Sequence, residues 1–335
     1  SNFQTAVNLW FDNQADANAT YGHISDWNTS AVTNMTNAFK DRTSFNEDIG
    51  DWDVSNVTTF FHLFRNAISF NQDLSDWNTS SLVNMSRCFD GARSFNSDLS
   101  KWDISNVNMM TAAFRNATSF NQNINSWDVS NVLNIENLFY GASVFNQPIG
   151  DWNTSSVTNM ISVFNNASAF NQPIGNWDTS SVTKMNRMFR DASDFNQDIS
   201  DWNISSANNM AIMFDGTNNL SNRNKSKIHS SFSANSNWSY DWSNFAPEDL
   251  QAVTNLEIVE NKPAGSFVGE FNASDPDDDQ LNYQVVQQLG SGQFAPFYIT
   301  QDGVLRTTRA LDFEEAESYE LTIRAVDPNG EMMQK

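Results

Sequence analysis

The side chains of this sequence with the clearest potential for chemistry are its carboxylates, which recur in close pairs such as Asp51 and Asp53. Two carboxylates at short range can act as acid and base in cleaving a glycosidic bond, so a glycosidase or a lyase is one reading. The same pair returns as Asp or Asn every 25 residues through most of the chain. Recurrence of this kind is typical of a scaffold and not of a single catalytic dyad.

Other residues with catalytic potential are scattered. His23, His62 and His229 lie in unrelated settings, with no Cys or Glu at metal-ligand spacing. Neither a G-x-S-x-G nucleophile motif nor a phosphate-cradling glycine loop is present in the sequence. The single cysteine, Cys88, stands where other repeats carry Leu, Val or Met, which predicts a buried apolar residue. We therefore predict that the protein is not an enzyme.

The charge balance restricts the partners. Forty acidic and 18 basic residues give a net charge of -22, which repels nucleic acid and anionic lipid and attracts divalent cations. The 39% hydrophobic content is enough for a packed core. No stretch approaches the roughly 18 apolar residues of a membrane span. The sequence thus predicts a globular chain that neither binds nucleic acid nor inserts directly into a membrane.

A 25-residue period runs through most of the chain. It is most visible in eight tryptophans, at positions Trp27, Trp52, Trp77, Trp102, Trp127, Trp152, Trp177 and Trp202. A fixed period of this length indicates stacked units that share one core and need a cap at each end. We expect an N-terminal cap over residues 1–24, a solenoid over residues 25–218 and a C-terminal cap over residues 219–246.

Each repeat is expected to contain one short helix and one strand. In one copy, Val57, Phe60, Phe64 and Ala67 step by three and four residues, which is the spacing of an apolar helical face. The segment from Phe70 to Trp77 is short, has an apolar residue at either end and suits a strand. Stacking one strand per unit gives a parallel sheet, so the predicted fold is an α/β solenoid.

Two columns of identical residues accompany the period. Asparagine follows the strand phenylalanine at Asn46, Asn71, Asn96, Asn121, Asn146, Asn171 and Asn196. An amide side chain both donates and accepts, so this column is expected to bind backbone from one coil to the next. The Trp and Phe columns are expected to fill the shared core, with sugar stacking by the tryptophans as the alternative.

The repeat phrases FNQ-(D/P)-I, DW-(D/N)-x-S and N-M-x-x-M-F-x-x-A, over residues 3–245, resemble those of the BspA-like bacterial leucine-rich-repeat surface proteins. The resemblance implies a leucine-rich-repeat-type solenoid in an extracellular bacterial surface protein that serves adhesion and recognition. The shared residues belong to the scaffold, so the resemblance transfers no binding site.

A different composition begins near residue 247. Alternating apolar residues between turn signals predict an antiparallel β-sandwich over residues 247–335. The phrases ENKP, DPDDD, LDFEE and AVD, in this order from about residue 253, resemble a cadherin-type repeat. The resemblance suggests that the module stops before its last strand.

The cadherin resemblance also implies calcium, a hard cation that takes six to eight oxygen ligands. Glu260, Asp312 and Glu314 match the end of such a module that faces the following one. Asp275, Asp277 and Asp327 match the end that faces the preceding one. Both groups are therefore candidate Ca²⁺ ligands, with a solvated acidic surface as the alternative.

Candidate partner-binding residues lie where single repeats break a polar column. They are Phe61, Met109, Tyr140 and Ile161, with Arg65 and Arg115 nearby, a mixture typical of protein interfaces. We expect an extracellular adhesion protein, part of a larger cell-surface protein, that binds a protein partner. That partner is either a second copy in a homodimer or a host surface protein. The alternative is a carbohydrate-binding module with aromatic platforms.

Overall fold

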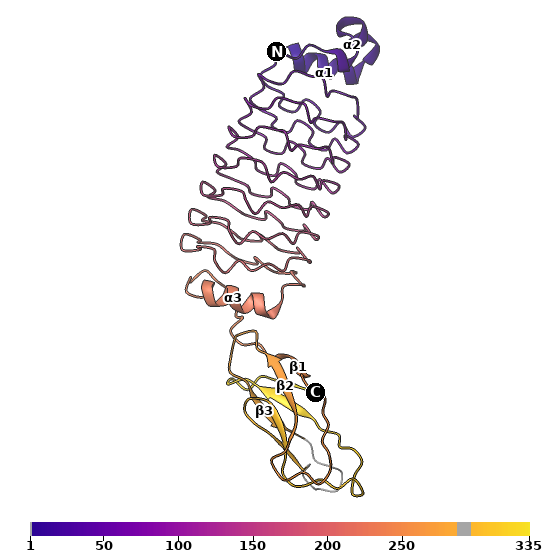
Figure 1. Cartoon of the computed structure of the whole chain (residues 1–335). Helices are drawn as coiled ribbons and strands as arrows, with labels where there is room; N and C mark the ends of the chain where they lie inside the picture. The colour runs from indigo at the N-terminus through magenta and orange to yellow at the C-terminus, as the bar shows by residue number, and fades with distance from the viewer. Residues whose placement is uncertain (1, 287–295) are drawn as a thin grey trace. The chain divides into compact units, whose positions relative to one another are not determined.

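The computed structural model of the chain describes residues 2–286 and 296–335, and these divide into two compact units. The first comprises the chain up to Leu220 together with Ser231–Tyr240. The second comprises Ser221–Ser230 and the chain from Asp241 onward. Helices occur at α1 (Asn2–Asp12), α2 (Gln14–Tyr21) and α3 (Asn222–Phe232), with a 3₁₀ turn at Ile24–Asp26 (Figure 1).

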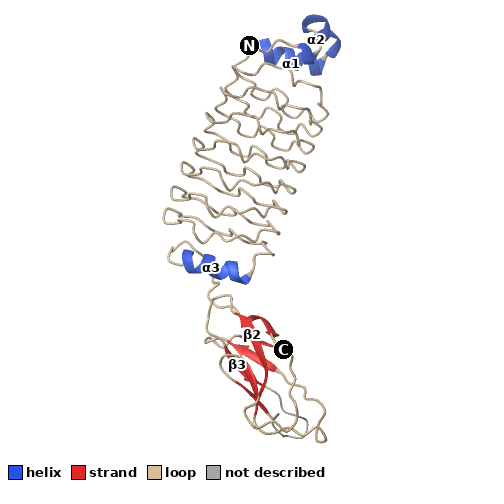
Figure 2. Ribbon diagram, viewed as in Figure 1, coloured by secondary structure: helices blue, strands red, loops and turns tan. Residues whose placement is uncertain are grey.

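The first unit is built from stacked coils of 25 residues, which we call the coil stack. Single parallel bridges join each coil to the next, at Asn34, Thr59, Asn84, Met109, Asn134, Asn159, Lys184 and Asn209 in turn. Figure 2 shows these coils as loops without regular secondary structure. Residues 27–220, every one of which the structure describes, contain no helix and no strand longer than a single bridge. The predicted helix and strand in each repeat are therefore wrong.

Tight turns replace the predicted helix because alternate N–H groups bond to the next coil. The N–H groups of Phe60 and Phe64 donate across to the carbonyls of Asn84 and Cys88, each at 2.8 Å. The N–H groups of Leu63 and Arg65 instead close four-residue β-turns, that of Leu63 onto the Phe60 carbonyl at 2.9 Å. Such turns need left-handed residues, and His62 and Asn66 have φ of 59° and 55°. The apolar spacing of three and four residues arises from these turns.

The asparagine column replaces the predicted strand. The N–H of Asn71 donates to Oδ1 of Asn46 at 2.8 Å, and that of Asn96 donates to Oδ1 of Asn71 at the same distance. The bond recurs in each later coil up to Asn196. Side-chain amides here satisfy backbone that a sheet ladder would otherwise pair. The predicted structural role of the asparagine column is confirmed.

Aromatic columns fill the core of the coil stack. The rings of Phe64 and Phe89 lie 5.5 Å apart and nearly parallel, as do those of Phe89 and Phe114. The indole of Trp77 is buried and donates its Nε1 proton to the Ile49 carbonyl at 3.0 Å. Equivalent tryptophans from Trp52 to Trp202 make the same bond, 28 residues back. The tryptophans are therefore core residues and present no face to a sugar.

Both ends of the coil stack are covered by residues of the first unit. Trp10 and Phe11 of α1 contact Trp27 and Phe45 at ring distances of 6.1 and 5.6 Å. In the last coil, the N–H of Phe214 has no following coil to bond. It donates instead to the Tyr240 hydroxyl at 2.8 Å. The Tyr240 ring also packs edge-on against Phe214. Tyr240 thereby supplies one of the hydrogen bonds that a further coil would make.

The second unit contains two antiparallel sheets. One has the order β1 (Glu248–Ala252), β2 (Phe267–Ser274), β5 (Val304–Thr307) and β4 (Phe297–Ile299). The other has the order β3 (Asn282–Val285), β6 (Ile323–Val326) and β7 (Met332–Gln334). Phe271, Leu305 and Ile323 form part of a common apolar core. The predicted antiparallel C-terminal module is confirmed, and we call it the β module.

Candidate functional site

Three predicted calcium ligands meet at one place in the β module. Oxygen atoms of Glu260, Asp312 and Glu314 lie within 4.8 Å of one another, and all three side chains are exposed. We call this group the carboxylate triad. Two oxygens on opposite sides of a calcium ion, each bound at about 2.4 Å, are about 4.8 Å apart. The triad therefore fits within the coordination sphere of one ion.

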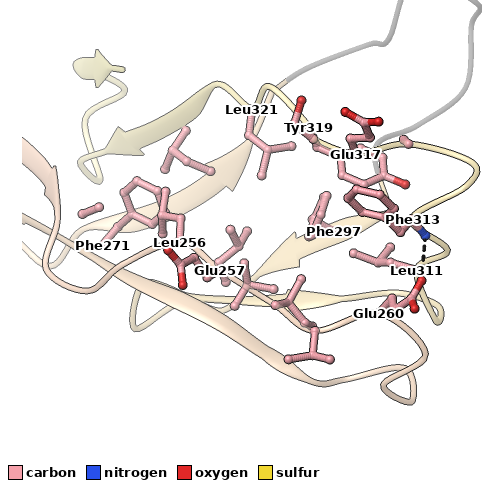
Figure 3. Close-up of a pocket in the computed structure, with 18 of the residues that line it drawn as sticks. Leu256, Glu257, Glu260, Phe271, Phe297, Leu311, Phe313, Glu317, Tyr319 and Leu321 are labelled. Carbon is pink, nitrogen blue, oxygen red and sulfur yellow. Dashed lines mark hydrogen bonds between the residues drawn. The ribbon is translucent and has the colours of Figure 1, made fainter.

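Backbone hydrogen bonds hold the triad together. The N–H of Asn261 donates to the Leu311 carbonyl at 2.9 Å, which fixes the two segments side by side. Glu260 accepts the N–H of Phe313 at 3.1 Å, drawn as the dashed line in Figure 3. Asp312 accepts the N–H of Glu314 at 3.0 Å. The carboxylates are thus preoriented by their own loops.

Crowding of the three carboxylates alters how they hold protons. The pKa of Glu314 is raised, chiefly by its hydrogen bond with Asp312 and also by the charges of Glu260 and Asp312. The pKa of Asp312 is lowered by the side-chain and backbone hydrogen bonds that it receives from Glu314. Glu314 therefore holds a proton more tightly than an isolated glutamate, and a bound cation would displace it.

The other three predicted calcium ligands are arranged differently. Asp275 and Asp327 are buried, with 6% and 5% of their surface exposed. Oδ1 of Asp275 accepts the N–H of Asp277 at 2.8 Å, and Oδ1 of Asp327 accepts that of Asn329, also at 2.8 Å. Oδ2 of each is buried without a hydrogen-bond partner. An unpaired buried carboxylate oxygen is costly, and a cation would satisfy it.

Asp277 is the third member of this second group. Its Oδ2 accepts the N–H of Phe245 at 2.6 Å. Burial raises the pKa of Asp275, and the charges of Asp277 and Asp279 add to the effect. Among the residues that the structure describes, only the carboxylate triad brings three acidic side chains within the distance of one ion. The carboxylates of the second group are suitable calcium ligands, but their oxygens do not all lie within the distance of one ion.

A cavity of about 1200 Å³ opens beside the triad, between the sheets of the β module. Core side chains such as Phe271, Phe297 and Leu311 line it, and Glu260 lies at its rim (Figure 3). The lining is mostly apolar, but Glu260 and Asp312 of the triad also belong to it. The triad therefore lies at the edge of this cavity, with its three side chains exposed.

The six residues predicted to bind a partner all lie on the coil stack. Phe61 and Ile161 occupy equivalent positions four coils apart and are half-buried. Met109, on a bridging position, is 52% exposed. Arg65, Arg115 and Tyr140 occupy one equivalent position in different coils. The structure therefore places these residues at three positions of the same turn segment and does not gather them into one compact cluster.

Asp90, which sequence reasoning missed, stands at the centre of the arginines. It occupies the coil between Arg65 and Arg115, at the same position, and is 2% exposed. Its carboxylate lies 3.6 Å from Arg65 Nε, 3.6 Å from Arg115 Nη1 and 3.3 Å from Arg87 Nη1. In the sequence, Asp90 stands 25 residues after Arg65 and 25 residues before Arg115. This spacing was a visible signal that the three side chains meet.

Electrostatics around Asp90 are dominated by positive charge. Burial raises the pKa of Asp90, while Arg115, Arg87 and Arg65 act in the opposite direction. The pKa of His62 is lowered to about 4, mainly by burial and further by Arg65, Arg87 and Lys40. Its ring stacks on Phe61 at 3.9 Å, and the Arg115 guanidinium lies 5.2 Å from the Tyr140 ring. Aromatic and cationic groups alternate across this face.

The remaining reactive side chain is Cys88. It is fully buried, and burial raises the pKa of its thiol well above the usual range. The predicted role as a buried apolar residue is confirmed.

Among the helices of the described residues, none combines the length and the apolar character needed to cross a bilayer.

Comparison with protein families gives two matches. The family model described as "Mycoplasma protein of unknown function, DUF285" matches residues 5–127 and 108–228. The model described as "Cadherin domain" matches residues 254–335, which contain the carboxylate triad. The two matches cover the coil stack and the β module respectively.

Curated relatives include protocadherins, which match about a quarter of the chain. Protocadherin alpha-13 of Pan troglodytes and that of Homo sapiens are each 36% identical over 86 residues, 24% of this chain and 9% of the relative. Protocadherin Fat 4 of Mus musculus is 41% identical over 73 residues, 21% of this chain and 1% of the relative. The chain thus spans about 9% of the length of the first two relatives.

Solved structures give the same kind of match. "Protocadherin Gamma B2 extracellular cadherin domains 1-5" has a TM-score of 0.22 and 24% identity, covering 25% of this chain and 18% of that one. "Crystal structure of the Protocadherin GammaB4 extracellular domain" has a TM-score of 0.23 and 27% identity, covering 27% and 15%.

Proposed function

Because this chain belongs to the family described as "Mycoplasma protein of unknown function, DUF285" and carries a cadherin domain, we propose that it is an extracellular adhesion segment that binds a protein partner. In this proposal the coil stack is a leucine-rich-repeat-type solenoid of a bacterial cell-surface protein, capped by residues 1–24 and 219–246. The cadherin-like β module supports the solenoid and is stiffened by calcium. The segment is not catalytic.

The carboxylate triad is the observation that carries the calcium part of the proposal. Three exposed carboxylates within 4.8 Å repel one another unless a proton or a cation neutralises them. Glu260, Asp312 and Glu314 supply hard oxygen donors, and water or neighbouring chain would complete six to eight ligands. Bound calcium would link the loop of Glu260 to that of Asp312 and so rigidify one end of the module.

A partner-binding role of the coil stack is supported by the composition of the face around Asp90. Arginine, methionine and aromatic residues are the types enriched at protein interfaces. Here Arg65, Arg115, Met109 and Tyr140 lie on neighbouring coils of an otherwise polar turn segment. The partner is either a second copy of the chain or a surface protein of another cell. Glycan binding is less well supported, since the repeat tryptophans are buried.

The catalytic alternative lacks support from the paired acids of the repeat. Asp53 and Asp103 each accept the N–H and the hydroxyl of the serine two residues on. Asn153 does the same for Ser155. An amide that substitutes for the carboxylate in this bond argues that the acid stabilises a turn and takes no part in acid and base catalysis.

An adhesion assay tests the proposal. Beads coated with the full chain are mixed with identical beads and, separately, with animal cells, in millimolar calcium and in chelator. We expect calcium-dependent adhesion in at least one setting. The matched variant E260Q/D312N/E314Q should lose the calcium dependence. Beads that adhere to neither target in calcium would overturn the proposed function.

A further inference from the structure

Three guanidinium groups converge on one carboxylate in the coil stack, so the face they form keeps excess positive charge. We call Arg65, Arg87 and Arg115 the arginine cluster. Arg87 donates one hydrogen bond to Asp90, whereas Nε of Arg65 is buried without an acceptor. The three side chains remain about one-third exposed. The cluster thus has donors and charge to offer, in a chain whose net charge is -22.

Asp90 gives this cluster a fixed geometry. Its carboxylate is almost fully buried and lies within 3.6 Å of a nitrogen on each arginine. Because the arginines come from three successive coils, the shared anion holds them at coil spacing and limits their rotamers. Preorganised side chains lose less entropy on binding than free ones. The surface is therefore suited to a partner whose own charges follow the same spacing.

Exposed apolar side chains occur on the coils of the arginine cluster and on the coil that follows. In the described part of the coil stack, all exposed large hydrophobic residues lie between residues 68 and 144. They are Ile68, Val83, Met109, Leu133 and Val144. The most exposed, Met109 and Leu133, have 52% and 53% of their surface in solvent. Their confinement to the coils of the arginine cluster and the coil that follows favours a partner contact in this part of the coil stack.

A row of aspartates lies at another position of the repeat. Asp53, Asp103, Asp128 and Asp178 occupy one equivalent position, and we call them the acid row. Each is exposed and uses Oδ1 to accept the N–H of a serine two residues on. The hydrogen bonds from these serines lower the pKa of all four carboxyls. The acid row is therefore ionised at neutral pH, and its hydrogen bonds from serine use Oδ1, which leaves Oδ2 available to a partner.

The two surfaces have matching spacing because they belong to the same repeat. Arg65 and Arg115 are two coils apart, and so are the pairs Asp53 with Asp103 and Asp128 with Asp178. The coil rise is nearly constant, since successive tryptophan rings lie 6.1 Å apart at Trp77 and Trp102 and 6.3 Å apart at Trp177 and Trp202. The acid row of a second copy of this chain has carboxylates at the same spacing as the arginines. An acidic segment without this repeat would not match that spacing.

The segments that carry the arginine cluster and the acid row both contribute rings to the core. Phe64, next to Arg65, and Trp77, from the segment of the acid row, meet inside the core at a ring distance of 6.3 Å. Their neighbouring outward side chains therefore leave the core in different directions. A contact between unlike surfaces is heterologous, and such contacts extend into open chains of molecules unless the rotation closes a ring.

We infer that a second copy of this chain docks with its acid row on the arginine cluster, so that copies associate head to tail through unlike faces. This inference rests on the proposed adhesion function and names its partner. Ion pairs between exposed groups are screened by salt, so the association weakens as ionic strength rises.

Two variants of the full chain test the inference by sedimentation at a series of concentrations. The first, R65N/R115N, removes two arginines; Asn165 occupies the same position in a later coil. The second replaces the acid row by asparagine, D53N/D103N/D128N/D178N. Asn28, Asn78, Asn153 and Asn203 already occupy that position, so this variant should fold, and R65N/R115N keeps the hydrogen bond from Arg87 to Asp90. The matched control is R187N/R190N, which changes two exposed arginines outside the cluster.

The expected result is complementation. Wild type and the control form oligomers that grow with concentration, and each variant alone associates on the order of tenfold more weakly or worse. An equimolar mixture of the two variants restores a dimer, because one supplies the acid row and the other supplies the arginines. A mixture that stays monomeric overturns the inference.

The change in net charge distinguishes the proposed contact from general charge repulsion. The acid-row variant changes the net charge from -22 to -18, so general repulsion alone predicts stronger self-association. Our inference predicts the opposite. Beads that adhere to cells while all soluble variants stay monomeric would refute the inference and leave the proposed function standing. Retention of wild type by a polyglutamate column, with no self-association, would assign the arginine cluster to a different acidic protein and also refute it.

Discussion

Arg65 and Asp90 occupy the same position in successive coils, and Arg65 Nε lies 3.6 Å from the buried Oδ2 of Asp90. The repeat thus places opposite charges one coil apart, and Arg115 repeats the relationship on the other side of Asp90. A buried carboxylate is tolerated here because three guanidinium groups compensate it. This arrangement makes the stability of the coil stack sensitive to one acidic residue.

Replacing Asp90 should destabilise the coil stack. D90N leaves Arg65, Arg87 and Arg115 close together without a counter-charge. Breaking a buried ion pair costs about 3–5 kcal/mol, and partial exposure of the arginines reduces our expectation to about 1–3 kcal/mol. Urea unfolding followed by tryptophan fluorescence measures the change. The control D76N removes the exposed ion pair with Lys101 and should leave the free energy of unfolding nearly unchanged.

Equal loss of stability in D90N and D76N would contradict the compensation of Asp90 by the arginines. A loss seen in D90N alone, which R65N partly relieves in the double variant D90N/R65N, would show that repulsion between guanidinium groups is its cause.

How far the sequence predicts the fold is clearest at the position of Asn66. Across the coils this position holds only Asp, Asn or Gly, the residues that best tolerate a left-handed backbone. The apolar spacing of three and four residues predicted a helix, because helices and these tight turns bury residues at the same intervals. The column of Asp, Asn and Gly was the signal against a helix. The burial of the phenylalanines was predictable whether the segment formed a helix or tight turns.

The candidate site was predictable to a different extent in each unit. Glu260, Asp312 and Glu314 are brought together as the sequence predicted, because their motifs lie in loops that pair through Asn261 and Leu311. Asp90 was missed because an acid on a turn segment is usually solvated, and only the packing of adjacent coils shows that this one is buried. The 25-residue period predicts where a residue lies along its coil, but it does not predict how deeply the side chain is buried.

The turn acids of the acid row should be replaceable by asparagine one at a time. D103N keeps an oxygen that accepts from Ser105, as Asn153 does for Ser155, so its free energy of unfolding should be unchanged. D103A removes the acceptor and should cost about 0.5 kcal/mol, a small value because both groups are solvent-exposed. Urea unfolding of the two variants side by side checks this. A loss in D103N as large as that in D103A would show that charge, and not the hydrogen bond, matters at this position.

Stability of the coil stack should depend on pH through His62. Its pKa in the folded state is about 4, below the ordinary value of 6.5, so the unfolded chain takes up the proton first as pH falls. The stabilising contribution is therefore fully present above about pH 6.5 and is lost as pH falls toward about 4. Urea unfolding at a series of pH values should show this decline.

The variant H62N removes the titration and keeps the backbone conformation, because Asn37 and Asn137 adopt positive φ at the same position. Its stability should decline less between pH 6.5 and pH 4 than that of wild type. A double variant H62N/R65N should not decline further. Parallel curves for wild type and H62N would rule out His62 as the source.

Calcium binding to the β module should compete with protons at Glu314. The pKa of Glu314 is raised by its hydrogen bond with Asp312 and by the charges of Asp312 and Glu260. A raised carboxyl pKa means that the proton persists to a higher pH than on an ordinary glutamate, so calcium must displace it. Calcium affinity, measured by isothermal titration calorimetry on the full chain, should therefore fall as pH is lowered through the range of that pKa.

Proton release on binding gives an independent readout, because titrations in buffers of different ionisation enthalpy differ in their apparent heat when protons are released. The variant E314Q should bind calcium more weakly at neutral pH and lose most of this buffer dependence, whereas E317Q, a nearby acid outside the triad, should behave as wild type. Calcium binding of unchanged affinity in E314Q would place the ion elsewhere. The second carboxylate group is then the site to examine, and D275N and D327N should abolish the heat instead. The Oδ2 atoms of these two aspartates are buried and have no hydrogen-bond partner.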